Sequence, residues 1–179
     1  MKRSDFYYEL PPELIASQPA VQRSGSRLMH VDISSGMISH HRFSEFPALL
    51  SIQDLLIFND TRVIPARFLG SKSTGGKVEI LLERITSDLT AKALIRSSKP
   101  LRKGSEIILS ADLPPVTVEG RQGQFYLLRF PPPGVACIAG SLGQVPLPPY
   151  IRRSPNKADR PRYQTVYARV PGAVAAPTA

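Results

Sequence analysis

The chain has 179 residues, 42% of them hydrophobic, which allows a buried core in one ordinary domain or two small ones. Its 23 Lys and Arg outnumber 14 Asp and Glu, and the formal net charge of +9 favours a polyanionic partner, nucleic acid first, with a merely solvated basic surface as the alternative. No signal-peptide core follows Met1 and no stretch approaches the roughly 20 apolar residues of a membrane span, so we expect a cytoplasmic protein that does not associate with membranes.

The first third of the chain predicts short helices and a hairpin. Residues 11–16 have proline in the first turn of a short helix, with Glu13 at its positive end. Residues 27–33 and 37–43 are extended segments around Ser34-Ser35-Gly36, the composition of a hairpin. A further short helix is expected at residues 44–50, capped by Ser44.

Residues 54–58 form a short apolar run that predicts a buried strand. The strand would deliver the polar groups of Asn59, Asp60 and Thr61 at its carboxyl end, a common place for active-site residues.

From about residue 66 to residue 130 the sequence consists of short β-type runs separated by turn residues, which predicts a small antiparallel barrel. The runs are residues 77–84, 90–95, 106–109, 116–119 and 124–129. Proline and glycine are dense at residues 131–134 and 143–150, so we expect a return linker there.

The predicted fold class is therefore α/β plus all-β. Residues 1–66 begin a discontinuous, barrel-like α/β domain, residues 67–145 form an inserted antiparallel β-barrel, and residues 146–179 resume the α/β domain.

Several common sites are not predicted. The glycine-rich residues 70–77 lack the Gly-Lys-Ser/Thr ending of a phosphate-binding loop and fit a flexible basic hairpin loop, and no Rossmann fingerprint occurs. The neighbouring His40 and His41 would point to opposite faces of a strand, so no metal site is expected. The single Cys137, in an apolar run, is expected to be a buried hydrophobe.

Two segments carry candidate site residues. After the strand at 54–58, Asp60, Arg62 and Arg67 could line one cleft, although an ordinary Asn-Asp turn with a surface ion pair fits equally well. Residues 160–169 mix arginines with tyrosines, and on a strand Tyr163, Thr165 and Tyr167 would share one face. The alternative is a core strand with wet tyrosine hydroxyls.

Six motifs, in register from end to end, resemble the S-adenosylmethionine:tRNA ribosyltransferase-isomerases of queuosine biosynthesis. They are residues 8–16, 59–67, 75–79, 143–151, 162–168 and 172–179. The resemblance implies a transferase that donates the ribosyl portion of S-adenosylmethionine to 7-aminomethyl-7-deazaguanine in tRNA, giving epoxyqueuosine, adenine and methionine. It implies no metal, and we expect a monomer.

Transferred onto this sequence, the resemblance predicts both catalytic and substrate-binding residues. The catalytic set is Asp60, Arg62 and Tyr163, and the substrate-binding set is Asn59, Thr61, Arg67, Gln164, Thr165, Tyr167 and Thr178. Asp60 would be the base or the ribose anchor. The arginines would hold a methionine carboxylate or a tRNA phosphate, and residues 163–165 would position the adenosyl group or the modified base.

The family continues beyond Ala179 into a Gly-Leu-His-Phe segment and a further large part of the α/β domain. We therefore expect the 179-residue chain, without that C-terminal part, to be marginally stable and inactive by itself. The alternatives are a non-catalytic basic RNA-binding module and an inactive truncated fragment of the enzyme.

Overall fold

The structure is a computed structural model that describes residues 1–175. The chain divides into two compact units. The first comprises Met1–Phe58 with Tyr150–Arg153, and the second comprises Asn59–Pro149 with the segment that starts at Ser154. The domain boundaries at residues 66 and 145 and the discontinuity of the α/β domain stay predictions.

The first unit contains the predicted hairpin. Strand β1 (Arg27–Val31) pairs antiparallel with β2 (Ile38–Arg42), with Arg27 opposite Arg42. Gly36 has a φ of 71°, which suits a residue without a Cβ in the turn. The hairpin prediction is confirmed.

The helices of this unit are all short 3₁₀ segments, namely Arg3–Phe6, Pro12–Leu14, Arg23–Gly25 and Phe43–Leu49. The last begins at Phe43 rather than after a Ser44 cap, and the carboxylate of Glu45 accepts a hydrogen bond from the backbone N–H of Arg42 at 3.2 Å. Pro47 lies inside this segment and has no N–H for a longer-range helical bond, which favours the tighter 3₁₀ form.

The strand expected at residues 54–58 is not formed. The segment has no regular secondary structure, and Leu55 and Ile57 are 85% and 79% exposed. A strand needs a neighbour for its backbone groups, and no other strand pairs with this segment within residues 1–175. An apolar run in the sequence does not reveal whether such a neighbour is present.

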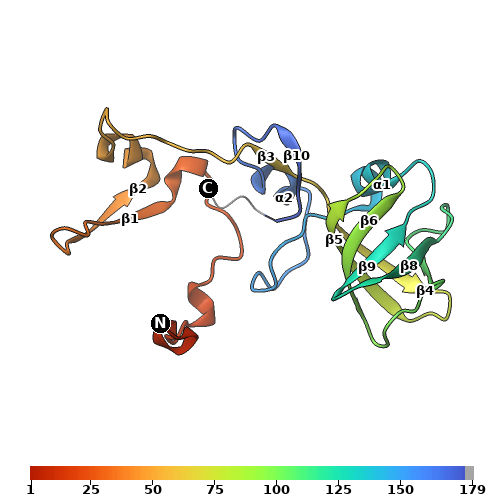
Figure 1. The fold of residues 1–179 in the computed structure, drawn as a ribbon. Helices are drawn as coiled ribbons and strands as arrows, with labels where there is room; N and C mark the ends of the chain where they lie inside the picture. Colours follow the sequence, from red (N-terminus) through yellow and green to blue (C-terminus); the bar gives the residue numbers. More distant parts are fainter. Residues whose placement is uncertain (176–179) are drawn as a thin grey trace. The chain divides into compact units, whose positions relative to one another are not determined.

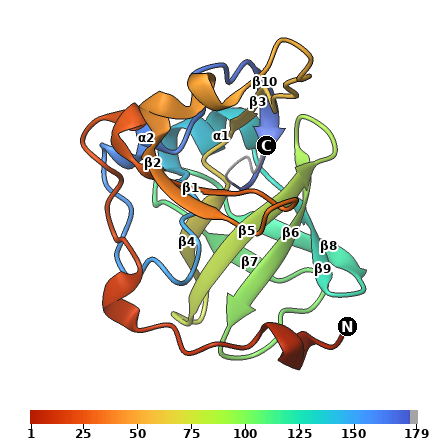
Figure 2. The ribbon, with the colours of Figure 1, turned by 90° about the vertical axis from the view of Figure 1, so that its left-hand side faces the viewer.

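A closed six-stranded barrel forms the larger part of the second unit (Figures 1 and 2). Neighbouring strands follow the order β4-β5-β6-β9-β8-β7, and all pairs are antiparallel. The strands are β4 (Arg67–Lys72), β5 (Lys77–Ile85), β6 (Thr90–Ser97), β7 (Glu106–Ile108), β8 (Val116–Gln122) and β9 (Phe125–Arg129). The predicted antiparallel barrel is confirmed.

The barrel core follows from alternation along its strands. On β5, Val78, Ile80 and Leu82 are buried and the residues between them are less so, the period of two expected where one face is inside. The rings of Phe68 and Phe130 meet in this core with centroids 5.7 Å apart. The barrel therefore has a hydrophobic core of its own.

Helix α1 (Val135–Leu142) lies between the two segments, residues 131–134 and 143–150, that were expected to form the return linker. It starts against the β5–β6 turn, where the N–H of Val135 donates to the carbonyl of Asp88 at 2.8 Å, and it buries Val135, Ile138 and Ala139 in the barrel core. Cys137 lies on the other face and is exposed, so the expectation of a buried thiol is wrong. Only one face of such a helix reaches the core.

A two-stranded parallel sheet completes the second unit. It consists of β3 (Thr61–Val63) and β10 (Val170–Ala173), with Val170 opposite Thr61 (Figure 1). The strand considered for residues 160–169 is absent, because the chain forms the short helix α2 (Asp159–Arg162) there and turns follow it. The carboxylate of Asp159 accepts a hydrogen bond from the N–H of Asn156 at 2.8 Å, which favours the turn that starts this helix.

Within residues 1–175, no helix is long and apolar enough to cross a membrane.

Candidate functional site

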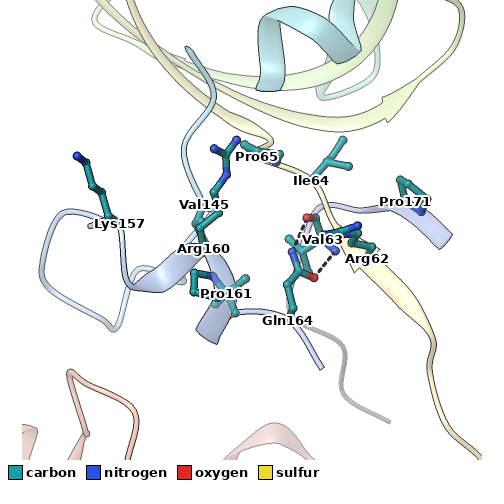
Figure 3. A pocket seen from close by; sticks show the side chains of 11 residues that line it. Arg62, Val63, Ile64, Pro65, Val145, Lys157, Arg160, Pro161, Gln164 and Pro171 are labelled. Carbon is teal, nitrogen blue, oxygen red and sulfur yellow. Dashed lines mark hydrogen bonds between the residues drawn. The ribbon is translucent and has the colours of Figure 1, made fainter. Parts of the chain in front are cut away.

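The candidate site is a cavity of about 640 Å³ in the second unit, a volume within the usual range of small-molecule sites. β3 and the residues after it form one side, and the segment around α2 forms another (Figure 3). Its lining residues are Arg62, Val63, Ile64, Pro65, Val145, Lys157, Arg160, Pro161, Tyr163, Gln164 and Pro171.

Three cations line this cavity, and no Asp or Glu does so among the described residues. Arg62 and Lys157 form no ion pair or hydrogen bond through their side chains within residues 1–175, and Arg160 donates to the carbonyl of Gly140 at 2.8 Å. In Figure 3, Arg62 and Lys157 lie on opposite sides of the view, with Arg160 between them. The arrangement leaves positive charge without a protein carboxylate, which favours an anionic ligand.

The wall of the cavity is held by two polar side chains from the segment after α2. The amide of Gln164 accepts from the N–H of Val63 at 2.9 Å and donates to its carbonyl at 2.8 Å (Figure 3). The hydroxyl of Tyr163 donates to the carbonyl of Pro146 at 3.0 Å. These bonds fix the wall to β3 and to the segment before Tyr150.

Asp60 lies directly before β3 and is held by Arg169. The guanidinium donates through Nε at 3.1 Å and through its terminal nitrogen at 2.8 Å to one carboxylate oxygen, and the Asp60 carbonyl accepts from the N–H groups of Arg169 and Val170. The Asp60 side chain stays 44% exposed. Arg169 therefore leaves the other carboxylate oxygen of Asp60 without a hydrogen bond from its guanidinium.

The neighbours of Asp60 have local roles. Asn59 accepts from the N–H of Thr61 at 3.0 Å, an Asx turn of the kind expected for an Asn-Asp sequence, and the hydroxyl of Thr61 donates to the carbonyl of Val170 at 3.4 Å. The segment therefore forms an ordinary Asn-Asp turn, and Asp60 forms an ion pair with Arg169 at the surface.

The other predicted residues are more dispersed. Arg67 is on the barrel, where Nε donates to Glu79 at 2.7 Å, and it does not line the cavity. The hydroxyl of Thr165 is buried without a hydrogen-bond partner, whereas Tyr167 is exposed. Thr178 lies outside the described residues. Of the ten predicted site residues, the cavity brings together Arg62, Tyr163 and Gln164.

Sequence reasoning missed Lys157, Arg160 and Arg169. Arg160 and Arg169 are the first and last residues of the segment 160–169, which mixes arginines with tyrosines. A strand there would bring other residues side by side than the short helix and turns that the structure shows. The signal in the sequence is charge: residues 152–169 contain six Lys and Arg and one acidic residue, the buried Asp159.

No group of three His, Cys, Asp or Glu side chains that could hold a metal ion occurs within residues 1–175. The cavity with three cations, next to the barrel, has the composition of a site that favours an anionic ligand. More specifically, the sequence model of the family described as "Queuosine biosynthesis protein" matches residues 3–179, and the chain belongs to that family.

Relatives of known name agree with this membership. The chain is 52% identical over 180 residues to the S-adenosylmethionine:tRNA ribosyltransferase-isomerase of Xanthomonas euvesicatoria pv. vesicatoria and 48% identical to that of Nitrosospira multiformis. Each match covers 100% of this chain and 50% of the relative, so the chain spans about half the length of these proteins.

A crystal structure of S-adenosylmethionine tRNA ribosyltransferase from Thermotoga maritima is also similar, with 34% sequence identity and a TM-score of 0.40. The match covers 82% of this chain and 52% of the Thermotoga chain.

Proposed function

We propose that the protein, at the full length of its relatives, transfers and isomerises the ribosyl moiety of S-adenosylmethionine onto 7-aminomethyl-7-deazaguanine in tRNA. The products are epoxyqueuosine in tRNA, adenine and methionine, and the reaction takes place in the cytoplasm. The observation that carries the proposal is the cavity with three cations and no carboxylate in its described lining, in a chain that matches the queuosine family over residues 3–179.

The substrate chemistry sets three requirements. The sulfonium acidifies the neighbouring ribose methylene, so a base must remove a proton there. The carbanion equivalent then rearranges, and adenine leaves with the help of a proton donor. An anionic end must also be held, because S-adenosylmethionine carries the methionine carboxylate and the tRNA carries phosphates.

In this proposal Asp60 supplies the carboxylate that acts as base or ribose anchor. Arg169 holds it from one side at 2.8 Å and its side chain remains 44% exposed, which fits a group that is oriented and still reachable. Tyr163 borders the cavity and can contact the adenosyl group, and Gln164 shapes the wall through Val63.

Cations other than Arg67 are proposed to bind the anionic end of the substrate. Because Arg67 is paired with Glu79 outside the cavity, Arg62 acts together with Lys157 and Arg160, whose side chains line the cavity. These three would hold the methionine carboxylate.

The test is Asp60→Asn in the protein at full family length. We expect epoxyqueuosine formation, followed by mass spectrometry of the tRNA nucleosides, to fall by roughly 100-fold or more, as for loss of a general base. Near-normal product formation with unchanged S-adenosylmethionine affinity would remove Asp60 from the site.

Two further variants separate chemistry from structure. Arg169→Gln breaks the same ion pair but keeps the Asp60 carboxylate, so it is expected to retain more activity than Asp60→Asn. Asp112→Asn removes an exposed carboxylate of the barrel and is expected to behave as the unmodified protein. Equal losses in Asp60→Asn and Arg169→Gln would assign Asp60 a structural role only.

A further inference from the structure

The barrel has an uneven distribution of positive charge. Eleven Lys and Arg occur from Arg67 to Arg129. Three of them, Arg67, Arg84 and Arg129, pair with the glutamates Glu79, Glu83 and Glu119. Two more lie over aromatic rings, Lys92 over Phe125 at 4.5 Å and Arg121 over Tyr126 at 5.3 Å from the ring centroid.

The other six cations form a group that we call the basic rim: Lys72, Lys77, Arg96, Lys99, Arg102 and Lys103. None of them has an ion pair with a carboxylate among the described residues. All except Lys72 are exposed. The one carboxylate between Leu89 and Ala111 is Glu106, so the four rim residues from Arg96 to Lys103 have little negative charge nearby in sequence.

Strand pairing places the basic rim at one end of the barrel. Ser71 is opposite Lys77 and Val78 is opposite Ser97, so the β4–β5 turn and the end of β6 lie together. The ammonium of Lys72 donates to the carbonyl of Lys99 at 2.8 Å, which links that turn to the segment after β6.

The segment with Arg102 and Lys103 reaches the same end. Lys72 is opposite Ile107 on β7, and the residues just before β7 are therefore beyond the end of β4. The N–H of Gly104 donates to the carbonyl of Val118 at 2.8 Å, which holds this turn to β8. Helix α1 packs at the opposite end, against the turn that contains Asp88.

A groove adjoins the basic rim on the side of the barrel. It has a volume of about 730 Å³ and is lined by Lys77, Arg96, Ser97, Ser98, Leu69, Gly70, Val78 and Glu79. Its one carboxylate, Glu79, is paired with Arg67 at 2.7 Å. The Ser97 hydroxyl donates to the carbonyl of Lys99 at 2.8 Å. The groove therefore offers two cations and the hydroxyl of Ser98, side chains of the kind that contact nucleic-acid phosphates.

We propose that the basic rim and this groove bind the sugar–phosphate backbone of the tRNA. This inference rests on the proposed function, which identifies the polyanion as tRNA. It adds the surface of the barrel that binds the tRNA. Phosphate contacts of this kind position an RNA without reading its sequence. The adenosyl chemistry is proposed for the cavity and for Asp60, and none of these residues belongs to the rim or the groove, so the rim variants change RNA binding and leave S-adenosylmethionine binding intact.

The experiment compares two triple variants of the same chain. Lys77→Gln/Arg96→Gln/Lys99→Gln alters the rim, and Arg84→Gln/Arg121→Gln/Arg129→Gln alters paired or stacked cations elsewhere on the barrel. Each removes three positive charges, so the formal net charge falls from +9 to +6 in both. Far-ultraviolet circular dichroism melts check that both fold, and unmodified tRNA transcript is the probe in titrations from 50 to 200 mM salt.

We expect the rim variant to bind tRNA roughly 10- to 100-fold more weakly, with a slope of log K against log salt smaller in magnitude by about 2 to 3. The control variant should lose less than about 3-fold, since its cations are already paired or stacked. Addition of polyglutamate as competitor tests the other polyanion class, and displacement of tRNA at equal charge concentration would contradict an RNA interface.

The remaining outcomes separate this inference from the proposed function. Equal losses in the two triple variants, or none in the rim variant, would overturn the rim as the RNA surface, while S-adenosylmethionine turnover at full family length would still support the reaction. A wild-type chain that binds no tRNA would overturn the inference directly, and turnover at full length then decides the proposed function alone.

Discussion

The side-chain amide of Gln164 forms two hydrogen bonds with the backbone of Val63, at 2.9 and 2.8 Å, across 101 residues of sequence. An amide presents a donor and an acceptor as a neighbouring strand would, so Gln164 extends the pairing of β3 on the side facing the cavity. Gln164 thus links the wall of the candidate site to the small parallel sheet.

Replacement of Gln164 by leucine keeps the size of the side chain and removes both bonds. Val63 is buried, so its N–H and carbonyl would lose partners at a cost of about 1–3 kcal/mol in the free energy of unfolding. Urea unfolding of the full chain, with hydrogen exchange of the Val63 amide, measures this. Gln53→Leu is the control, because Gln53 is exposed, and equal effects of the two changes would contradict the bracing role.

Two glycines at the end of α1 differ in the space around them. A Cβ on Gly143 would collide with the carbonyl oxygens of Pro65 and Ala139, whereas a Cβ on Gly140 meets nothing within 4 Å. We expect Gly143→Ala to lower the free energy of unfolding by about 1–3 kcal/mol or more, and Gly140→Ala to raise it by up to roughly 1 kcal/mol. Thermal melts of the two variants decide this, and a stable Gly143→Ala protein would contradict the close approach.

The barrel could be predicted because its strands carry their own signal. Val78, Ile80 and Leu82 alternate with less buried residues, and this period of two reports one buried face whatever lies further along the chain. Strand β4 was not predicted, because Gly70 and Ser71 are residues typical of loops. Gly70 is needed there since a Cβ would come within 2.6 Å of the Ile108 carbonyl on β7.

The other elements depend on tertiary contacts that a sequence pattern does not reveal. Residues 54–58 have the composition of a buried strand, but no described strand pairs with them and they are exposed. Helix α1 was not predicted, because prolines precede it and Gly140 lies inside it. Its contacts with the barrel core stabilise the helix despite that composition. For the cavity, Arg62, Tyr163 and Gln164 could be selected from sequence, whereas Lys157 and Arg160 required knowledge of the fold around helix α2.

The hairpin turn of the first unit should respond to acid. The hydroxyl of Ser34, the hydroxyl of Ser35 and the N–H of Ser34 all donate to Asp32 and hold its pKa well below the usual range. A lowered pKa in the folded state means that the carboxylate stabilises the hairpin above the unfolded pKa of about 4, and that this stabilisation is lost as pH falls below it.

Backbone hydrogen exchange or NMR shifts of β1 and β2, recorded from pH 7 to pH 2, follow this transition. Asp32→Asn should weaken the hairpin at pH 7 and flatten its response to pH. Ser34→Ala/Ser35→Ala keeps the carboxylate and should move the transition toward ordinary carboxylate pH values. An acid response unchanged in both variants would assign it to other groups.

The cations of the cavity should act on the methionine end of S-adenosylmethionine. Lys157→Gln/Arg160→Gln, made in the protein at full family length, removes two charges that line the cavity without a carboxylate among its described residues. Hydrogen bonds to charged groups contribute about 1.5–3 kcal/mol, so we expect S-adenosylmethionine to bind at least roughly 10-fold more weakly. Calorimetric titration gives the dissociation constant.

The discriminating ligand is methylthioadenosine, which keeps the adenosyl group and lacks the methionine carboxylate. Its affinity should be unchanged by Lys157→Gln/Arg160→Gln if these side chains hold the carboxylate. Arg121→Gln/Arg129→Gln removes the same charge from the barrel and should change neither ligand. A variant that binds S-adenosylmethionine normally but tRNA more weakly would reassign Lys157 and Arg160 to an RNA phosphate, and the carboxylate would then need another partner, with Arg62 the remaining cation of the described lining.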